Sequence, residues 1–481
     1  MTSRSATQTL ASFASRVTFE DLPPQVVHKA KQVILDMVGC ALGGYSHDIG
    51  NLSRNFVTSL GGTPESVVVG SGEKTSCTNA AFVNGNMANA IDFDDNFMNL
   101  GHPAAPLVWA AIPLGERERV SGRDLITAAV VGYDIAARVG VSTEFPGILE
   151  GGVLKRRPVY SLSWHAFGAV AGGGKILRLD EEQMAHAFGI LGLLAPMPAL
   201  GAWSQHTEGL SLMKYISQGW ASQGGVTAAL LAKAGYTGNT TILDGDLGFW
   251  RMEGNAECDF DYMVSELGGK WWIMESAVKP WPCCRHAHPP LTAFTELIRK
   301  YNLKPEEIDE VLIKAREVTW FAMVHPKARV DGQWSAPYCF ANAAYNITPG
   351  PQWHYPERMN DPLLRRFREK VKIETDPKTV EVLKEQVTGK PPKRVKRTPT
   401  TVEVKARGQL FTHSVEYAKG DPWVPETVMS DQELKEKFTA NAIDVAAGSA
   451  VWRQKISQVI EMIYDLEKVR DITELTTLLA P

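Results

Sequence analysis

Along most of the chain, apolar residues recur at the three- to four-residue spacing of amphipathic helices. The segment 21–44 is the clearest case, because Val26, Ala30, Val33 and Met37 fall on one face. Helix is therefore expected to dominate up to about Gly269. The same spacing predicts further helices at residues 79–91, 122–140, 163–177, 180–194 and 213–235.

Several of these predicted helices carry small residues on one face, for example Gly168, Gly172, Gly219 and Gly225. A glycine inside a helix costs about 1 kcal/mol relative to alanine. We expect close helix–helix approach within a large helical domain to offset this cost, because a Cβ at such a crossing would clash.

The pattern changes after Lys279. Residues 305–318 and 401–420 alternate apolar and polar positions and predict β-strands, with a turn at 407–408. The same part of the chain contains short helical segments at 342–347 and 361–371, and a polar, proline-containing loop at 388–401.

Helical spacing resumes at Ser430, and Glu433 follows it in the arrangement of a capping box. The chain has 481 residues, whereas single cores usually stop growing at about 250 to 300 residues. The expected fold is therefore mainly α: a large all-helical domain built from residues 1–272 and 425–481, and a smaller α+β domain inserted at 273–424.

Composition excludes several classes of partner. The formal net charge is -4, so no overall field favours nucleic acid or an anionic membrane. The six cysteines lack CxxC spacing, which indicates a reducing compartment. No apolar run approaches the roughly 20 residues of a membrane span, and no secretory signal is recognisable. We expect a cytoplasmic protein; residues 1–19 weakly resemble a mitochondrial transit peptide, which makes the mitochondrial matrix the alternative.

Three aspartates, Asp92, Asp94 and Asp95, crowd the end of a predicted helix. Negative charge there opposes the helix dipole, and carboxylates so close together raise the pKa of at least one of them. A raised carboxyl pKa suits proton transfer near neutrality. Helical spacing would place Asp92, Asp95, Asn96 and Asn99 on one side. A solvated acidic cap is the alternative interpretation.

Two histidines and a lysine are further candidates. His102 precedes Pro103, whose ring restricts the histidine backbone to an extended conformation, and His165 begins a glycine-rich helix. Taken singly, a histidine among apolar residues is more often part of the core. Lys214 begins another helix of small residues. A buried lysine needs a counter-charge, which is either an aspartate of the protein or a substrate carboxylate.

A short segment bounded by prolines concentrates titratable groups. Zinc binding is one interpretation, but adjacent cysteines point in different directions and no second ligand pair occurs elsewhere. We expect no metal, and instead a loop that brings cations for carboxylates and an imidazole for proton transfer. The residues are Lys279, Cys283, Cys284, Arg285, His286 and His288.

Other motifs are absent or weak. The sequence has no P-loop, no HExxH and no GxGxxG between a strand and a helix, so no cofactor is predicted. A basic run in the proline-containing loop most simply forms a solvated surface, and consists of Lys390, Lys393, Arg394, Lys396 and Arg397.

Several segments together resemble the MmgE/PrpD family, which includes 2-methylcitrate dehydratases, cis-aconitate decarboxylases and an epimerase of iminodisuccinate. The matching segments occur in the order of the family and cover nearly the whole chain. They are IDFDD with GHP, WHAFGAVAGGGKIL, the segment from MKYISQGW to ILDG, KPWPCCRHAHPP, and VEYAKGDPWVPETVMSDQELKEKF.

The resemblance implies a large helical domain, a smaller lid domain, a homodimer, and a site in the cleft between the domains without metal or organic cofactor. As a hypothesis, His102 and His165 serve as general base and acid with Asp92, and Lys214 binds carboxylates with weaker help from Lys279 and Arg285. The site positions that match the family's are Asp92, Asn96, His102, His165, Lys214, His288 and Tyr338.

The chain departs from the family in two places. Asn96 stands where cis-aconitate decarboxylases and methylcitrate dehydratases commonly have threonine, and Ala104 and Ala105 replace the Ser-Asp of the dehydratases. The second departure counts against methylcitrate as substrate. The expected function is a cofactor-independent lyase, a dehydratase or decarboxylase, acting on a small di- or tricarboxylic acid. Epimerisation of a dicarboxylate is one alternative, and an inactive helical scaffold is the other.

Overall fold

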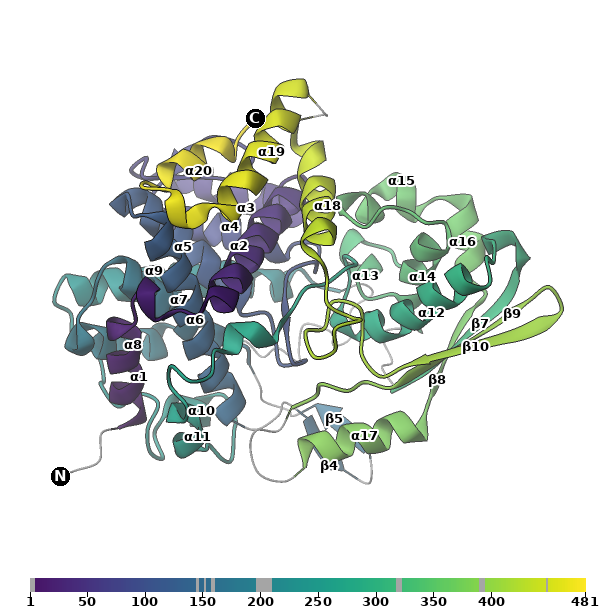
Figure 1. Ribbon diagram of the computed structural model, residues 1–481, viewed down its shortest axis with the longest axis horizontal. Helices are drawn as coiled ribbons and strands as arrows, with labels where there is room; N and C mark the ends of the chain where they lie inside the picture. Colours follow the sequence, from purple (N-terminus) through teal and green to yellow (C-terminus); the bar gives the residue numbers. More distant parts are fainter. Residues whose placement is uncertain are drawn as a thin grey trace.

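The computed structural model describes residues 5–143, 147–150, 153–156, 161–195, 210–316, 322–388, 394–446 and 449–481. Within these residues the fold is mainly α, as predicted. Helices from both ends of the chain form one body, in which α18 packs against α2 (Figure 1). The longer helices of this body are α1 (Ala6–Arg16), α2 (Pro24–Gly44), α3 (Asp48–Leu60), α4 (Cys77–Asn89), α5 (Ala104–Glu118), α6 (Gly122–Ser142), α7 (His165–Ile176), α8 (Glu181–Leu194), α9 (Met213–Lys233), α18 (Asp431–Ala442), α19 (Ala450–Tyr464) and α20 (Thr473–Leu478).

Close helix crossings at the centre of the body explain the glycines. Helix α7 packs against α5, α6 and α9. A Cβ on Gly168 would lie 2.7 Å from the carbonyl oxygen of Gly132, and one on Gly225 would lie 2.5 Å from the Cβ of Ala169. The predicted close approach is therefore confirmed, and it positions the first turns of α7 and α9, where two candidate residues lie.

Helix α6 is long and apolar enough to cross a membrane by length and composition alone. Its apolar window is entirely buried inside the protein, where it packs against α5 and α7. These contacts are those of a central core helix.

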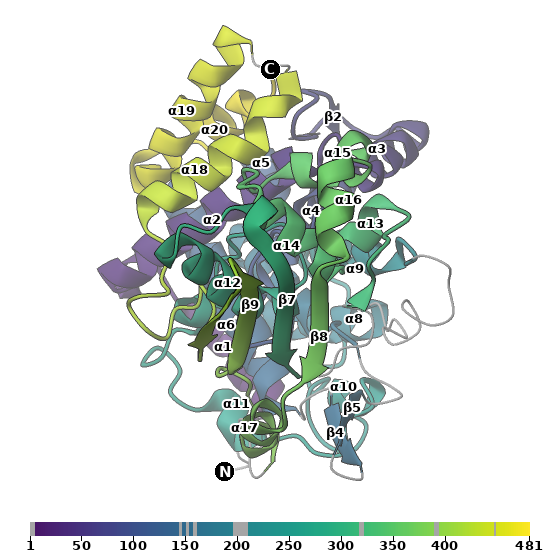
Figure 2. The same cartoon turned by 90° about the vertical axis from the view of Figure 1, so that its right-hand side faces the viewer.

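The second part of the structure is an α+β unit around a four-stranded sheet of order β10-β9-β7-β8 (Figure 2). Strands β7 and β8 are parallel and the other pairs are antiparallel. The predicted turn is present, with positive φ at both Arg407 (54°) and Gly408 (70°). The elements are β7 (Ile308–Ala315), β8 (Val371–Thr375), β9 (Thr400–Ala406), β10 (Gln409–Val415), α12 (His288–Lys300), α14 (Ala336–Ala344), α16 (Pro362–Arg368) and α17 (Pro377–Val387).

Each part has its own apolar core. The larger core joins the helices of the body, and a second core lies between the sheet and α12, α14 and α16, where Phe294, Phe340 and Phe367 meet. Three residues of the predicted inserted segment, Leu383, Val387 and Val395, pack on the larger core. The boundaries predicted at 273–424 and the role of this unit as a lid remain predictions.

Several elements are only two to five residues long. The most important is the pair of β3 (Asn96–Phe97) and β6 (Ser276–Ala277), which places the aspartate-rich segment beside the segment that contains Lys279. The remaining short elements are β1 (Ser66–Val67), β2 (Lys74–Thr75), β4 (Gly147–Glu150), β5 (Val153–Arg156), α10 (Phe249–Met252), α11 (Phe260–Val264), α13 (Arg329–Gly332) and α15 (Pro356–Met359).

The basic run is only in part the solvated surface that the sequence predicts. Arg394 is buried, and its guanidinium packs 4.2 Å from the ring centre of Trp272 and donates to the hydroxyl of Tyr262. Lys396 and Arg397 form ion pairs with glutamates of neighbouring segments. Lys390 and Lys393 lie outside the described residues.

Candidate active site

The aspartate-rich segment forms a tight turn directly after α4. Helix α4 ends at Asn89, and Asp92 adopts a left-handed conformation with φ of 50°, which is uncommon for a residue other than glycine. Two buried lysines bond to successive carbonyls of this turn: Lys279 donates to the carbonyl of Asp92 (2.8 Å) and Lys437 to that of Phe93 (2.7 Å). Such bonds can offset the backbone strain, which is typically of order 1–3 kcal/mol.

The carboxylate of Asp92 is the centre of the charged cluster. Its Oδ1 accepts hydrogen bonds from Nζ of Lys214 and Nζ of Lys279, both at 2.9 Å. Burial alone would raise the pKa of Asp92, but the two ammonium groups hold the pKa well below its ordinary value. Asp92 is therefore ionised, and its Oδ2 is buried without a hydrogen-bond partner among the described residues.

Lys214 reaches this carboxylate from the first turn of α9, as the sequence predicted for a buried lysine with an aspartate as counter-charge. Its ammonium lies 4.7 Å from the ring centre of Tyr215 and 5.0 Å from that of Trp334. The Tyr215 hydroxyl in turn donates to Gln333, so the aromatic wall around the ammonium is fixed by hydrogen bonds. Cation–π contacts of this kind stabilise a desolvated ammonium group.

His102 presents a neutral imidazole to the same carboxylate. Its Nδ1 lies 2.7 Å from the carbonyl oxygen of Asp95, so Nδ1 carries the hydrogen and Nε2 is an acceptor. Nε2 lies 3.9 Å from Oδ1 of Asp92. Burial first, and then the charges of Lys279 and Lys214, hold the pKa of His102 well below its ordinary value. The geometry thus leaves one basic nitrogen beside two ammonium groups.

His165 contacts the main chain of His102. Its Nε2 accepts a hydrogen bond from the backbone N–H of His102 at 3.1 Å. Burial lowers the pKa of His165 to about 3, so this ring is neutral too. The contact requires Gly101, because a Cβ there would lie 2.3 Å from Nε2 of His165. With Nε2 occupied, His165 is suited to holding His102 in place.

The other two aspartates behave differently from Asp92. The pKa of Asp94 is raised to about 6, because burial and, to a smaller extent, the nearby charge of Asp92 together outweigh the lowering effect of Lys279. Burial also raises the pKa of Asp95, which accepts hydrogen bonds from the hydroxyl of Tyr133 and the backbone N–H of Ala104. The predicted rise in at least one carboxyl pKa is confirmed in direction.

The predicted helical arrangement of these residues is wrong. Because the chain turns at Asp92 and enters β3, Asp95 faces Tyr133 while Asp92 faces the lysines. Asn96 instead holds the following turn, where its Oδ1 accepts from the backbone N–H of Asn99 at 3.0 Å.

The cluster has one arrangement that could accept a metal ion. Asp92, Asp94 and His102 each offer a ligand atom, and these atoms lie within 4.8 Å of one another. Oδ1 of Asp92, however, already accepts from Lys214 and Lys279. A divalent cation at this oxygen would lie beside two positive charges, so the donor set fits ammonium groups better than a metal. The expected absence of a metal remains a prediction.

Of the predicted site residues, the structure brings together Asp92, His102, His165, Lys214 and Lys279. Their contacts join the turn after α4, the segment before α5, the first turns of α7 and α9, and the segment after β6.

Three other predicted residues make their hydrogen bonds or ion pairs with groups outside this cluster. The guanidinium of Arg285 pairs with Asp421 at 2.6 Å, His288 Nε2 lies 3.1 Å from the carbonyl oxygen of Cys283, and the Tyr338 hydroxyl donates to a backbone carbonyl in the second core. In the described ranges, no hydrogen bond or ion pair joins them to Asp92. Their roles in substrate binding or catalysis therefore remain predictions.

Lys437 and Asp36 also support the cluster, although no local sequence signal predicts them. Lys437 bonds to Phe93 across 344 positions of sequence and pairs with the buried Asp36 at 2.6 Å. Both lie on ordinary amphipathic helices, α18 and α2, and nothing in their local sequence distinguishes them. Only the packing of α18 on α2 brings them behind the aspartate turn.

Comparison with known proteins gives consistent matches along the chain. Residues 8–258 match the MmgE/PrpD N-terminal domain, and residues 281–461 match the MmgE/PrpD C-terminal domain. The chain is 27% identical to a cis-aconitate decarboxylase of Aspergillus terreus, over 70% of this chain and 71% of that protein. It is 24% identical to cis-aconitate decarboxylases of Homo sapiens, over 99% of this chain and 95% of that protein, and of Mus musculus, over 99% and 93%.

Proposed function

Because the chain belongs to the MmgE/PrpD family, we propose that it is a cofactor-independent lyase acting on a small di- or tricarboxylic acid. One observation carries the proposal: Lys214 and Lys279 converge on Oδ1 of Asp92 beside the free Nε2 of His102. Two ammonium groups and one ionised carboxylate leave a local surplus of positive charge when Asp94 is protonated. Such a site favours a substrate with several carboxylates.

The proposed chemistry is proton transfer at a carbon next to carboxylates. Removing such a proton, or losing CO₂, builds negative charge on the substrate, and preorganised ammonium groups stabilise that charge best. Lys214 and Lys279 would bind the substrate carboxylate and the developing enolate-like charge. His102, held through Nδ1 by the carbonyl of Asp95, would accept the proton of a carbon acid at Nε2. In decarboxylation Nε2 would first take a proton from water and then deliver it to the carbanion that loss of CO₂ leaves.

Decarboxylation of cis-aconitate is the first reaction to test, because the similar proteins of Aspergillus terreus, Homo sapiens and Mus musculus are cis-aconitate decarboxylases. Dehydration of a hydroxy acid uses the same groups. Epimerisation of a dicarboxylate is the alternative, and needs an acid and a base on opposite faces of the carbon.

A substrate panel distinguishes these reactions. The purified protein should be incubated with cis-aconitate, citrate, methylcitrate and iminodisuccinate, and the products separated by mass and chirality. Loss of CO₂ or of water from one of the acids supports the lyase. Inversion without loss of mass identifies an epimerase, and no turnover of any acid, with no thermal shift on adding them, favours a scaffold. Light scattering of the same sample tests the proposed homodimer, and elemental analysis tests for a metal.

A further inference from the structure

A buried glutamine of the α+β unit bridges the two elements that carry Asp92 and Lys214. Gln333 directly follows α13, and none of its surface is exposed. Its Nε2 donates to the carbonyl of Ala90 at 2.9 Å, two residues before Asp92. Its Oε1 accepts from the hydroxyl of Tyr215, the neighbour of Lys214 on α9. One side chain therefore ties the aspartate turn to the start of α9.

The partners of Gln333 require both a donor and an acceptor at this position. The carbonyl of Ala90 can only accept a hydrogen bond. Burial raises the pKa of Tyr215 well above its ordinary value, so the phenol keeps its proton. The indole N–H of Trp334 donates to the Tyr215 oxygen at 3.3 Å, which leaves the phenol hydrogen for Gln333. An amide satisfies both partners, whereas an apolar side chain satisfies neither.

The same bonds fix the aromatic rings around the ammonium of Lys214. Tyr215 and Trp334 flank this ammonium, and each of them takes part in the hydrogen bonds around the Tyr215 hydroxyl. On its other side the ammonium donates to Asp92, which belongs to the turn that Gln333 also contacts. The position of the ammonium thus depends on groups that Gln333 connects.

Helix α13 anchors Gln333 in this place. Val330 of α13 packs with Ala90 and Tyr215 in a small apolar cluster. Asp331 accepts from the backbone N–H of Leu210 at 2.8 Å, in the segment that leads into α9. Because α13 contacts both elements on its own, Gln333 completes an existing junction between them.

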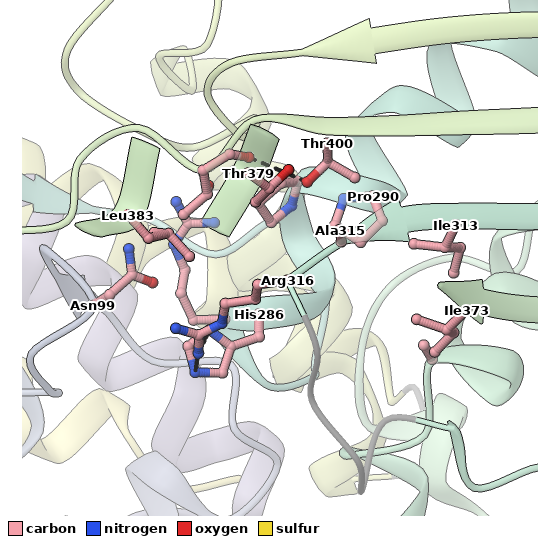
Figure 3. Close-up of a pocket in the computed structure, with 14 residues that line it drawn as sticks. Asn99, His286, Pro290, Ile313, Ala315, Arg316, Ile373, Thr379, Leu383 and Thr400 are labelled. Atoms are coloured by element: carbon pink, nitrogen blue, oxygen red, sulfur yellow. Dashed lines mark hydrogen bonds between the residues drawn. The ribbon is translucent and has the colours of Figure 1, made fainter. Parts of the chain in front are cut away.

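The main chain of Gln333 contacts a third segment, beside a small pocket. Its carbonyl accepts from the backbone N–H of Cys284 at 2.9 Å. The next residues, Arg285 and His286, line the pocket together with Asn99 (Figure 3). Its volume is about 40 Å³, which is room for about three waters at roughly 10–15 Å³ each. A di- or tricarboxylic acid does not fit there, so the pocket does not compete with the Asp92 cluster as the substrate site.

From these contacts we propose that Gln333 is a positioning residue, which holds the ammonium of Lys214 at Asp92 by tying α9 to the aspartate turn. It acts through Tyr215 and Ala90, to which it bonds. Its consequence for the substrate rests on the proposed function, in which Lys214 binds a carboxylate. The placement of Lys214 itself can be measured in the protein alone.

Acetylation of lysines by acetic anhydride, followed by mass spectrometry, tests the placement without a substrate. Gln333→Met keeps the length of the side chain but loses the amide, and Tyr215→Phe removes only the hydroxyl. In both variants we expect the acetylation rate of Lys214 to rise roughly threefold or more, because its surroundings loosen locally. Lys31, which is similarly buried and is paired with Glu467, should keep its wild-type rate.

Asn84→Leu is the matched control for the loss of a buried bridging amide. The Asn84 side chain also donates to one backbone carbonyl, that of Val67, and accepts from one backbone N–H, that of Val69. Its replacement should leave the ratio of the two lysine rates at the wild-type value. No rise for Lys214 in either test variant, an equal rise for Lys31, or the same change of ratio in the control overturns the inference.

Steady-state kinetics on the acid that the wild type converts tests the consequence. Q333M should raise KM roughly fivefold or more and lower kcat by less, because His102 is held separately by His165 and Asp95. Q333M/Y215F should raise KM at most about twofold beyond Q333M, since both changes break the same bond. Multiplied effects on KM would contradict the proposal. If no acid is converted, the proposed function fails, and the acetylation rates still decide the role of Gln333.

Discussion

Nε2 of His165 accepts a hydrogen bond from the backbone N–H of His102, at 3.1 Å, so one histidine holds the other by its main chain. This relationship separates the roles of two residues that the sequence analysis treated as an acid and base pair. His102 keeps a free ring nitrogen toward Asp92, whereas the corresponding nitrogen of His165 is occupied.

Replacing His165 should therefore misplace His102 without removing the proton-transfer group. For His165→Leu we expect kcat to fall by roughly 10²-fold, the scale of a displacement of about 1 Å near a reacting group. The remaining activity should keep the pH profile of the wild type. A changed pH profile in H165L would instead assign the titrating group to His165.

Gly101 should be intolerant of any side chain. In Gly101→Ala the new Cβ would lie 2.3 Å from Nε2 of His165, so the imidazole or the turn must move. We expect a loss of about 1–3 kcal/mol in the free energy of unfolding, together with reduced turnover. Urea unfolding measures the first effect. Gly408→Ala, at an exposed hairpin turn with positive φ and nothing within 4 Å of the new Cβ, is a control for backbone strain alone. Turnover of G101A equal to that of G408A would contradict the account.

Lys437 and Asp36 should act as one unit behind the aspartate turn. Lys437→Met leaves the buried Asp36 without its 2.6 Å partner, and breaking such a pair typically costs about 3–5 kcal/mol. In Lys437→Met/Asp36→Leu the unpaired charge is gone, so most of the stability should return. Turnover should not return, because Phe93 still lacks its lysine. Additive losses of stability would show that the two residues are independent.

Asp94 should make both stability and activity depend on pH. Its pKa is raised from 3.8 to about 6, mainly by burial, so folding favours the protonated carboxyl. The stability that it contributes is present at acidic pH and is lost as the pH rises from about 3.8 to about 6. The same ionisation places a negative charge 3.7 Å from Lys279 and should weaken binding of an anionic substrate.

The pH effect can be isolated with Asp94→Asn. Between about pH 5 and pH 7.5 we expect the KM of the wild type to rise roughly three- to tenfold relative to that of D94N. Taking the ratio of the two proteins cancels the titration of the substrate itself. A ratio that stays constant with pH would exclude Asp94 as the titrating group.

Much of the fold follows from the spacing of residues along the chain. Long helices such as α2 and α6 bury one or more faces, so their apolar period is strong, and the glycines of α7 and α9 mark crossings that the structure contains. Helix α5 was missed, because Pro106 and Pro113 interrupt its pattern although both lie inside the helix. The two-residue strands β3 and β6 are too short to show any period.

The candidate site was only partly predictable, because local spacing does not record contacts between segments that are far apart in the sequence. Charge crowding and motif positions indicated Asp92, His102, His165 and Lys214, which meet in space. The left-handed backbone of Asp92 was not predictable, because it depends on distant lysines that bond to its carbonyls. A partner that is hundreds of residues away, such as Lys437, leaves no trace in local spacing.

The most direct test of the account is the turnover of His102→Asn on whichever acid the wild type converts. Asparagine can keep an N–H near the position of Nδ1, for the carbonyl of Asp95, but has no equivalent of Nε2. The account predicts a loss of roughly 10² to 10⁴-fold in kcat. The unfolding midpoint, and the affinity of the Asp92 cluster for tricarballylate, a tricarboxylate with no hydroxyl group or double bond to react, should stay close to those of the wild type. Turnover within a few-fold of the wild type, in a protein that folds and binds normally, would contradict it.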